Sequence, residues 1–269
     1  MTNMNNSLNN MRLLDDLARK ETSIHRIHPL IKLLITVVYL TVVVSFARYE
    51  IAGLLPFIFY PVLIFAFAEI PVGAILKRLL LVTPFIVGIG ILNPVFDHQQ
   101  VVVFGLAISR GWLTFLAILL KSGLTVTVSL LLIATTGMDR LAAALRMLKV
   151  PKIFVLQLLL TYRYISVLLE EVSRMMRAYS MRAPRQKGIH RSAWGSFAGQ
   201  LILRTFDRGQ RVYQSMNLRG FTGEYHTGDI AKIRAKDLAY LAGWSLFFIL
   251  ARLYNLPMLI GSLFTGMVQ

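Results

Sequence analysis

The sequence contains no cysteine, which excludes disulfides, thiolate metal sites and cysteine nucleophiles. It also lacks the G-x-x-x-x-G-K-[ST] loop that holds nucleotide phosphates and the H-E-x-x-H zinc motif. Charged residues make up 16% of the 269 residues, whereas soluble domains carry about 25%. Residues 1–29 are polar, so we expect no cleavable signal peptide. The missing phosphate-binding loop argues against a chain that hydrolyses ATP itself.

Long apolar runs are the dominant feature of the sequence. Hydrophobic residues make up 56% of the chain, and the mean hydropathy is +0.61. A helix that spans a bilayer needs about 20 mostly apolar residues. We therefore predict an all-α integral membrane protein of the cell membrane with about five transmembrane helices. The predicted spans are residues 30–47, 51–68, 79–95, 111–136 and 238–256.

The charge of the chain is strongly positive and unevenly distributed. The net charge is +16, and residues 138–236 hold 18 Lys and Arg against six Asp and Glu. Basic segments of membrane proteins stay on the cytoplasmic side. We therefore predict three parts: residues 1–137 with four spans, a cytoplasmic helical block 138–236, and a last span in 237–269. The N-terminus is expected inside and the C-terminus outside.

The stretch 151–169 is apolar enough to be considered a sixth span. It contains Gln157 and Arg163, and a central arginine costs at least ~2.5 kcal/mol to insert. We predict instead a helix that begins after Pro151 and runs to about Arg182, because proline suits the first turn of a helix. Whether residues 151–169 touch or enter the membrane stays open.

A few polar residues lie within or beside the apolar runs. Lys121 falls in the middle of the fourth predicted span, and intramembrane charges are candidate functional residues. The alternative is that the true span starts later, so that the Lys121 side chain reaches the membrane–water interface. His25 and His28 lie close together without an acidic residue to orient them, so we interpret them as interfacial histidines. We predict no bound metal, no cofactor and no catalytic residue in this chain.

Two arginines occupy similar places in the basic block. Arg182 precedes Ala183, and Arg219 precedes Gly220, each at the end of a predicted amphipathic helix. A helix C-terminus carries a partial negative charge that tolerates arginine. A small neighbour would let a partner approach the guanidinium, which offers a rigid fork of donors. The matched pair favours a docking role, although C-capping arginines on solvated helices are the alternative.

Several further segments together resemble a known family. They are Leu14-Asp15-Asp16-Leu17-Ala18, His28-Pro29-Leu30-Ile31-Lys32-Leu33-Leu34, Ala134-Thr135-Thr136, Leu141-Ala142-Ala143-Ala144-Leu145-Arg146, Val150-Pro151, Tyr162-Arg163-Tyr164 and Leu168-Leu169-Glu170-Glu171. With the two arginine motifs, they make the chain similar to the transmembrane (T) component of energy-coupling factor (ECF) importers, in the cobalt-type CbiQ family. The likeness is clearest over residues 12–223.

The resemblance implies a non-catalytic subunit that joins two cytoplasmic ATP-binding subunits to a substrate-binding membrane subunit. The family carries an Ala-Arg-Gly-like motif on each coupling helix, and by position its arginines correspond to Arg182 and Arg219. The sequence departs from that motif because Met181 and Leu218 replace the first alanine, and Ala183 replaces one glycine. The implied cargo is cobalt, with nickel as the alternative.

Two other functions are compatible with the composition. A membrane-embedded enzyme acting on lipid or isoprenoid phosphates would need clustered aspartates to hold Mg²⁺, but the aspartates of the basic block and last span are scattered singly. A basic adaptor that binds anionic lipid or nucleic acid would suit the interleaved arginines. The apolar stripes at helical spacing favour protein contacts instead, so we expect the bilayer but no nucleic acid as a partner.

Overall fold

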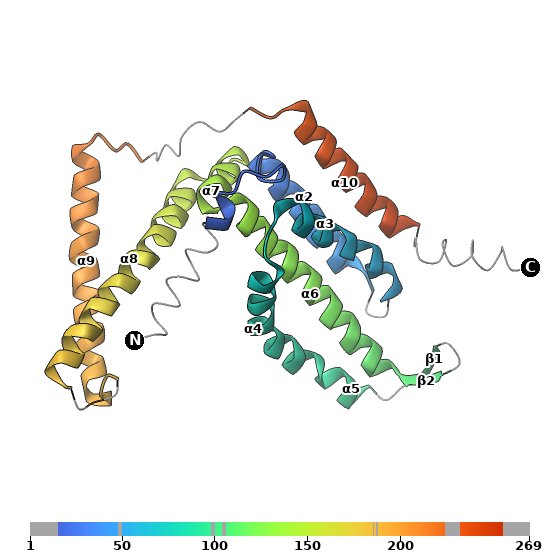
Figure 1. Cartoon of the computed structure of the whole chain (residues 1–269), viewed down its shortest axis with the longest axis horizontal. Helices are drawn as coiled ribbons and strands as arrows, with labels where there is room; N and C mark the ends of the chain where they lie inside the picture. The colour runs from blue at the N-terminus through green and yellow to red at the C-terminus, as the bar shows by residue number, and fades with distance from the viewer. Residues whose placement is uncertain are drawn as a thin grey trace, which may run out of the picture. The chain divides into compact units, whose positions relative to one another are not determined.

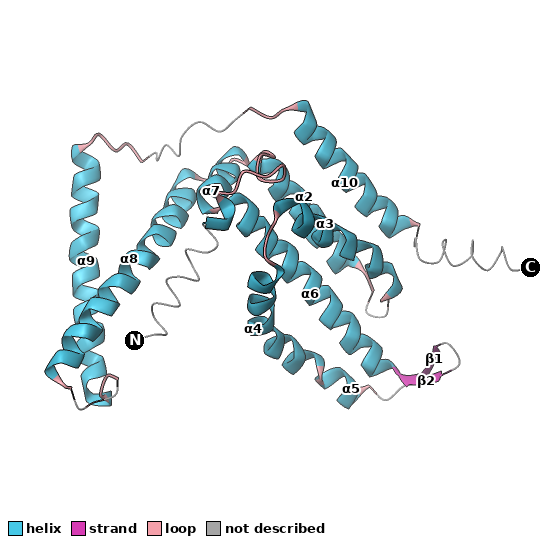
Figure 2. Cartoon of the chain, viewed as in Figure 1, coloured by secondary structure: helices cyan, strands magenta, loops and turns pink. Residues whose placement is uncertain are grey.

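The computed structural model describes residues 16–47, 50–97, 100–103, 106–184, 186, 188–223 and 232–254. These residues are almost entirely helical (Figures 1 and 2). The chain divides into two compact units. Unit 1 comprises Met1–Leu14 and Met138–Ile230, and unit 2 comprises Asp15–Gly137 and Ala231–Gln269. The prediction of an all-α membrane protein is confirmed.

Unit 2 contains the apolar helices. They are α2 (Pro29–Ser45), the 3-10 helix η1 (Ala52–Ile58), α3 (Phe59–Ala68), α4 (Val72–Gly90), α5 (Leu92–Phe96), α6 (Arg110–Thr136) and α10 (Ala235–Leu253). A hairpin of β1 (Gln100–Val103) and β2 (Leu106–Ser109) precedes α6; the sequence patterns do not predict it. Within unit 2, α6 packs against α2, α3, α4 and α5, and α10 packs against α2.

Three segments of the described chain are long and apolar enough to cross a membrane: Val72–Phe96, Arg110–Thr136 and Lys152–Arg182. The apolar segments Pro29–Ser45 and Ala52–Ala68 are shorter. The third of the long segments contains most of residues 151–169, which we interpret as a helix lying against the membrane or the base of the bundle. Whether these residues touch or enter the membrane stays open.

The predicted boundaries differ from the structure at several helices. The span predicted at 79–95 begins earlier, because α4 starts at Val72 and includes Lys77 and Arg78, the residues expected to precede it. The span predicted at 51–68 is broken into η1 and α3, and η1 contains Pro56. Proline removes a backbone donor and clashes with the preceding turn, which explains the irregular first half.

An aromatic cluster forms the core of unit 2. Tyr39 of α2, Phe57 of η1 and Phe248 of α10 are fully buried, and their ring centroids lie 5.2–5.8 Å apart. The Tyr39 hydroxyl donates to the Phe57 carbonyl oxygen over 3.1 Å. Such aromatic pairs contribute roughly 0.5–1.5 kcal/mol beyond the burial of their surface. The cluster therefore fixes α2, η1 and α10 against one another.

A buried polar cluster lies at the ends of α2, α6 and α10. Asp237 accepts hydrogen bonds from the backbone N–H groups of His28 (3.2 Å) and Arg234 (2.9 Å), so one carboxylate caps the starts of α2 and α10. Lys32 Nζ donates to the Thr135 carbonyl oxygen (2.9 Å) near the end of α6. Both placements match the helix dipole, which favours anions at N-termini and cations at C-termini.

Unit 1 contains α7 (Met138–Met147), α8 (Lys152–Arg182), the 3-10 helix η2 (Arg191–Ala193) and α9 (Trp194–Leu218). Ala142 of α7 packs against Val155 and Leu159 of α8. Gly137 alone separates α6 from α7. It has a left-handed φ of +76°, and its N–H donates to the Ile133 carbonyl oxygen over 2.9 Å.

Candidate functional site

Helices α8 and α9 form an antiparallel pair, and the chain reverses between them through η2. Tyr179 holds this reversal in place: its hydroxyl donates to Gln186 Oε1 (2.9 Å) and accepts from the His190 backbone N–H (3.3 Å). The His190 side chain in turn accepts from the Ser192 N–H at the start of η2 (3.4 Å). The end of α8 and the start of α9 are thereby tied together.

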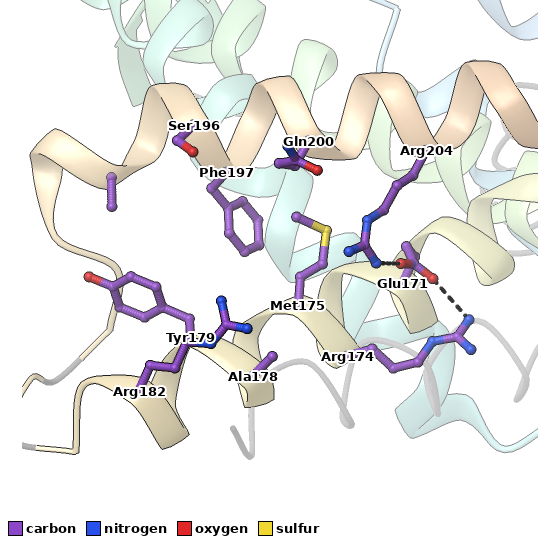
Figure 3. Close-up of a pocket in the computed structure, with 11 residues that line it drawn as sticks. Glu171, Arg174, Met175, Ala178, Tyr179, Arg182, Ser196, Phe197, Gln200 and Arg204 are labelled. Atoms are coloured by element: carbon purple, nitrogen blue, oxygen red, sulfur yellow. Dashed lines mark hydrogen bonds and ion pairs between the residues drawn. The ribbon is translucent and has the colours of Figure 1, made fainter.

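A groove of about 740 Å³ lies between the two helices (Figure 3). Its wall contains arginine side chains as well as apolar side chains. The lining residues are Glu171, Arg174, Met175, Ala178, Tyr179, Arg182, Ala193, Ser196, Phe197, Gln200 and Arg204. The sequence patterns do not identify this groove, because it depends on how two helices pack rather than on the spacing within either one.

Glu171 is the acidic residue of the groove. Its carboxylate accepts from Arg204 over 2.7 Å and pairs with Arg174 of its own helix over 3.1 Å. Glu171 lies in the second half of α8, which also carries Arg174, Arg177 and Arg182. The hydrogen bond from Arg204 is the main cause that lowers the pKa of Glu171 below that of an ordinary carboxyl, with Arg174 contributing. The bridge connects α8 to α9.

Arg182 is the last residue of α8, and Ala183 caps the helix. The Ala183 N–H donates to the Tyr179 carbonyl oxygen over 3.0 Å, and its φ of −128° is not left-handed. The Arg182 side chain is exposed and lines the groove, where its guanidinium group points toward Ala178 and Met175 (Figure 3). The sequence predicts this arginine at a helix end, and the structure adds that it lines the groove between α8 and α9.

Arg219 caps the end of α9, and Gly220 follows with a left-handed φ of +75°. The Gly220 N–H donates to the Asn217 carbonyl oxygen (3.0 Å), and the Phe221 N–H donates to the Met216 carbonyl oxygen (3.0 Å). This pattern is the usual glycine-terminated helix end. A Cβ at Gly220 would meet no atom within 4 Å, so the backbone conformation rather than crowding requires glycine.

The structure does not bring the two arginine motifs together. Arg182 ends α8, near the start of α9, whereas Arg219 lies at the end of α9. A straight helix of 25 residues is about 37 Å long, so the two motifs are separated by roughly the length of α9. One ligand of ordinary size cannot contact both. The arrangement provides two separate contact points on one helical pair.

Each arginine follows a highly exposed apolar residue. Met181 is 77% exposed and Leu218 is 89% exposed. These are the residues by which the sequence departs from the alanine of the family motif. Methionine and arginine are enriched at protein interfaces relative to the rest of the surface. Met181 and Leu218 differ from the alanine of the motif, and their exposure makes them candidate contact residues.

Lys121 lies in α6, within unit 2. Its Nζ donates to the carbonyl oxygens of Phe46 (2.6 Å) and Ala47 (3.1 Å), where α2 ends. Arg252 of α10 adds a hydrogen bond to the Ser45 carbonyl oxygen (3.2 Å) and an ion pair with Glu50 (3.0 Å). The contacts assign Lys121 to capping the C-terminus of α2.

The paired histidines are part of the fold of unit 2. Both His25 and His28 are buried, and His28 Nδ1 accepts from the Leu30 N–H at the start of α2. His25 Nδ1 lies 2.7 Å from the Thr22 hydroxyl. In the part of the chain that the structure describes, no three His, Cys, Asp or Glu residues gather as a metal site would require.

A family model described as "Cobalt transport protein" (CbiQ) matches residues 20–228. Two proteins of Methanocaldococcus jannaschii are similar to this chain. The uncharacterized protein MJ1571 is 28% identical over 186 residues, which are 65% of this chain and 63% of the relative. The uncharacterized protein MJ1089 is 31% identical over 124 residues, 45% of this chain and 46% of the relative. The matched regions thus span less than two thirds of either relative.

Proposed function

The chain belongs to the CbiQ family of cobalt transport proteins, and we propose that it is the transmembrane coupling subunit of an ATP-driven ECF-type importer. In this role it binds two cytoplasmic ATP-binding subunits and a substrate-binding membrane subunit. Conformational change in the ATPases passes through α8 and α9 to the membrane helices. The chain itself hydrolyses nothing, in keeping with its lack of a phosphate-binding loop.

The single observation that carries the proposal is the repeated pairing of an exposed apolar residue with an arginine at the ends of α8 and α9. Met181 with Arg182 and Leu218 with Arg219 provide two similar anchors on one helical pair. Their separation by about the length of α9 suits two copies of a similar partner better than one. Two ATP-binding subunits would each take one anchor.

The cargo is proposed to be cobalt or nickel ions, held by the substrate-binding subunit. Basic residues predict that the N-terminus and residues 138–236 face the cytosol. The C-terminus, predicted outside, falls beyond the described residues. The alternative of an enzyme acting on lipid phosphates gains no support, because Asp139, Asp207 and Asp237 lie on three different helices and Asp229 falls outside the described residues.

The proposal is tested by affinity purification of the tagged chain from its native membranes, followed by mass spectrometry. We expect two ATP-binding polypeptides and a further membrane protein. Arg182→Ala and Arg219→Ala should each remove one ATPase contact and abolish uptake of labelled Co²⁺ or Ni²⁺, while the membrane unit stays folded. Arg177→Ala is the matched control, because Arg177 is an exposed arginine of α8 outside the two motifs. Normal assembly and uptake by the Arg182/Arg219 double variant would contradict the proposal.

A further inference from the structure

The groove between α8 and α9 contains more cationic than anionic side chains. Arg174, Arg182 and Arg204 line it, and Glu171 is its acidic residue. Glu171 pairs with Arg174 and Arg204, whereas Arg182 pairs with no carboxylate among the described residues. Among the described residues, the side chains that line the groove therefore carry a net positive charge, and the Arg182 guanidinium lies in the groove without a carboxylate partner (Figure 3).

The positive charge continues along the helical pair. A second hollow of about 240 Å³ shares Glu171 and Arg204 with the groove and adds Arg208 and Arg211 against Asp207. A concave surface lined by one sign of charge concentrates ions of the opposite sign. The potential along α8 and α9 thus favours an anionic ligand.

The chemistry of the lining narrows the class of anion. Guanidinium groups bind phosphate oxygens through paired hydrogen bonds, with better geometry than ammonium groups. Arg174 and Arg204 are already oriented by Glu171, so binding would cost them little side-chain freedom. Met175 and Phe197 provide apolar contacts, and Ser196 and Gln200 provide polar ones. The volume lies in the range of small-molecule sites, about 300–1,000 Å³.

We propose that this groove binds a phosphate monoester or diester, with its phosphate oxygens on Arg174, Arg182 and Arg204. The ligand is either the headgroup of an anionic phospholipid or a soluble phosphate compound. Arg182 belongs both to this groove and to the first docking motif, whereas Arg174 and Arg204 lie outside the two docking motifs. The proposal therefore does not rest on the coupling role.

The test uses the full chain in phosphatidylcholine nanodiscs. One arm measures binding of fluorescent phosphatidylglycerol, and the other measures binding of inorganic pyrophosphate by calorimetry. Arg174→Gln and Arg204→Gln should each weaken binding about ten-fold, the effect of losing a hydrogen bond to a charged group. Arg177→Gln, an exposed arginine of the same helix outside the groove, should leave binding unchanged.

Glu171→Gln separates a binding site from a structural bridge. Both Glu171→Gln and Arg204→Gln break the contact between α8 and α9, so a purely structural role would shift binding in the same direction. In an anion site, removal of the carboxylate removes a competitor for the arginines, so Glu171→Gln should tighten binding while Arg204→Gln weakens it.

The pattern of results identifies the source of the phosphate. Site-dependent binding of phosphatidylglycerol that pyrophosphate does not displace supports a lipid headgroup; displacement or direct pyrophosphate binding supports a soluble compound. Equal losses in Arg177→Gln and Arg204→Gln would overturn the proposal in favour of nonspecific attraction. Absence of binding to both probes would also overturn it.

Discussion

Lys121 Nζ lies 2.6 Å from the carbonyl oxygen of Phe46, a residue 75 positions earlier in the chain. Lys32 makes the reciprocal contact, from near the start of α2 to the Thr135 carbonyl oxygen near the end of α6. Each helix therefore supplies a lysine that caps the C-terminus of the other. The two lysines supply donors to the C-terminal carbonyl groups of both helices, which would be costly to leave unsatisfied where they are buried.

The capping contact predicts a stability defect for Lys121→Met. The substitution leaves the last carbonyl groups of α2 without this donor, so we expect a loss of roughly 1–3 kcal/mol. Thermal unfolding in detergent measures it. Lys77→Met is the matched control, because Lys77 is an exposed lysine of α4. Equal stability of the two variants would show that the Lys121 contact contributes nothing.

The left-handed backbone at Gly220 predicts that its replacement distorts the end of α9. Gly220→Ala should cost roughly 1–2 kcal/mol, because a Cβ disfavours this conformation although space for it is open. Gly220→Asn should be tolerated better, since asparagine adopts left-handed conformations more readily. The readouts are thermal unfolding of the chain and its affinity for the ATP-binding subunits.

Gly199→Ala is the control for this effect. Gly199 lies in the helical interior of α9 with open space around its Cα, so alanine there should stabilise the helix or leave it unchanged. If Gly220→Ala and Gly199→Ala change the unfolding temperature equally, the left-handed conformation at the end of α9 does not require glycine.

The exposed apolar residues predict a contact role for Met181 and Leu218. Truncation of either to alanine should weaken binding of an ATP-binding subunit at least about five-fold, roughly 1 kcal/mol, without changing the unfolding temperature. Pull-down titration measures the affinity. Leu203→Ala, which truncates another exposed leucine of α9 away from the motifs, should have no effect. A shared loss in all three variants would indicate a diffuse apolar surface instead of two anchors.

The lowered pKa of Glu171 predicts how the α8–α9 contact responds to acid. A carboxyl whose pKa is lower in the folded state stabilises the fold above its unfolded pKa, about 4.3, and loses that contribution as pH falls through the folded value. The bridge to Arg204 should thus persist at neutral pH and weaken only below the pKa of an ordinary glutamate, about 4.3. Spin labels on the two helices would report the separation, and Glu171→Gln should remove the pH dependence of this contact.

Local patterns predicted much of the helical framework. Apolar runs located α2, α6 and α10 to within a few residues, and the amphipathic stretches located the ends of α8 and α9 where Arg182 and Arg219 lie. The structure starts α4 at Val72, before the predicted boundary at residue 79, because Lys77 and Arg78 continue the helix: their long side chains can carry the charge away from an apolar surface.

The features that the sequence did not reveal depend on contacts between distant residues. Asp237 reaches His28 across 209 positions, and Arg204 reaches Glu171 across 33. Helical periodicity indicates that a face is apolar or basic, but it does not say which face of another helix will meet it. The groove between α8 and α9 likewise depends on how two helices pack, because its lining residues come from both of them.

The junction at Gly137 limits how motion can pass along the chain. Gly137 is the single residue between α6 and α7. A displacement of α7 is therefore either absorbed by the φ and ψ torsions of Gly137 or transmitted to α6. Its positive φ leaves little latitude for a side chain, and a Cβ would lie 3.2 Å from the Cβ of Ala18. The connection between α6 and α7 is therefore a single residue, and any side chain introduced at this position would strain it.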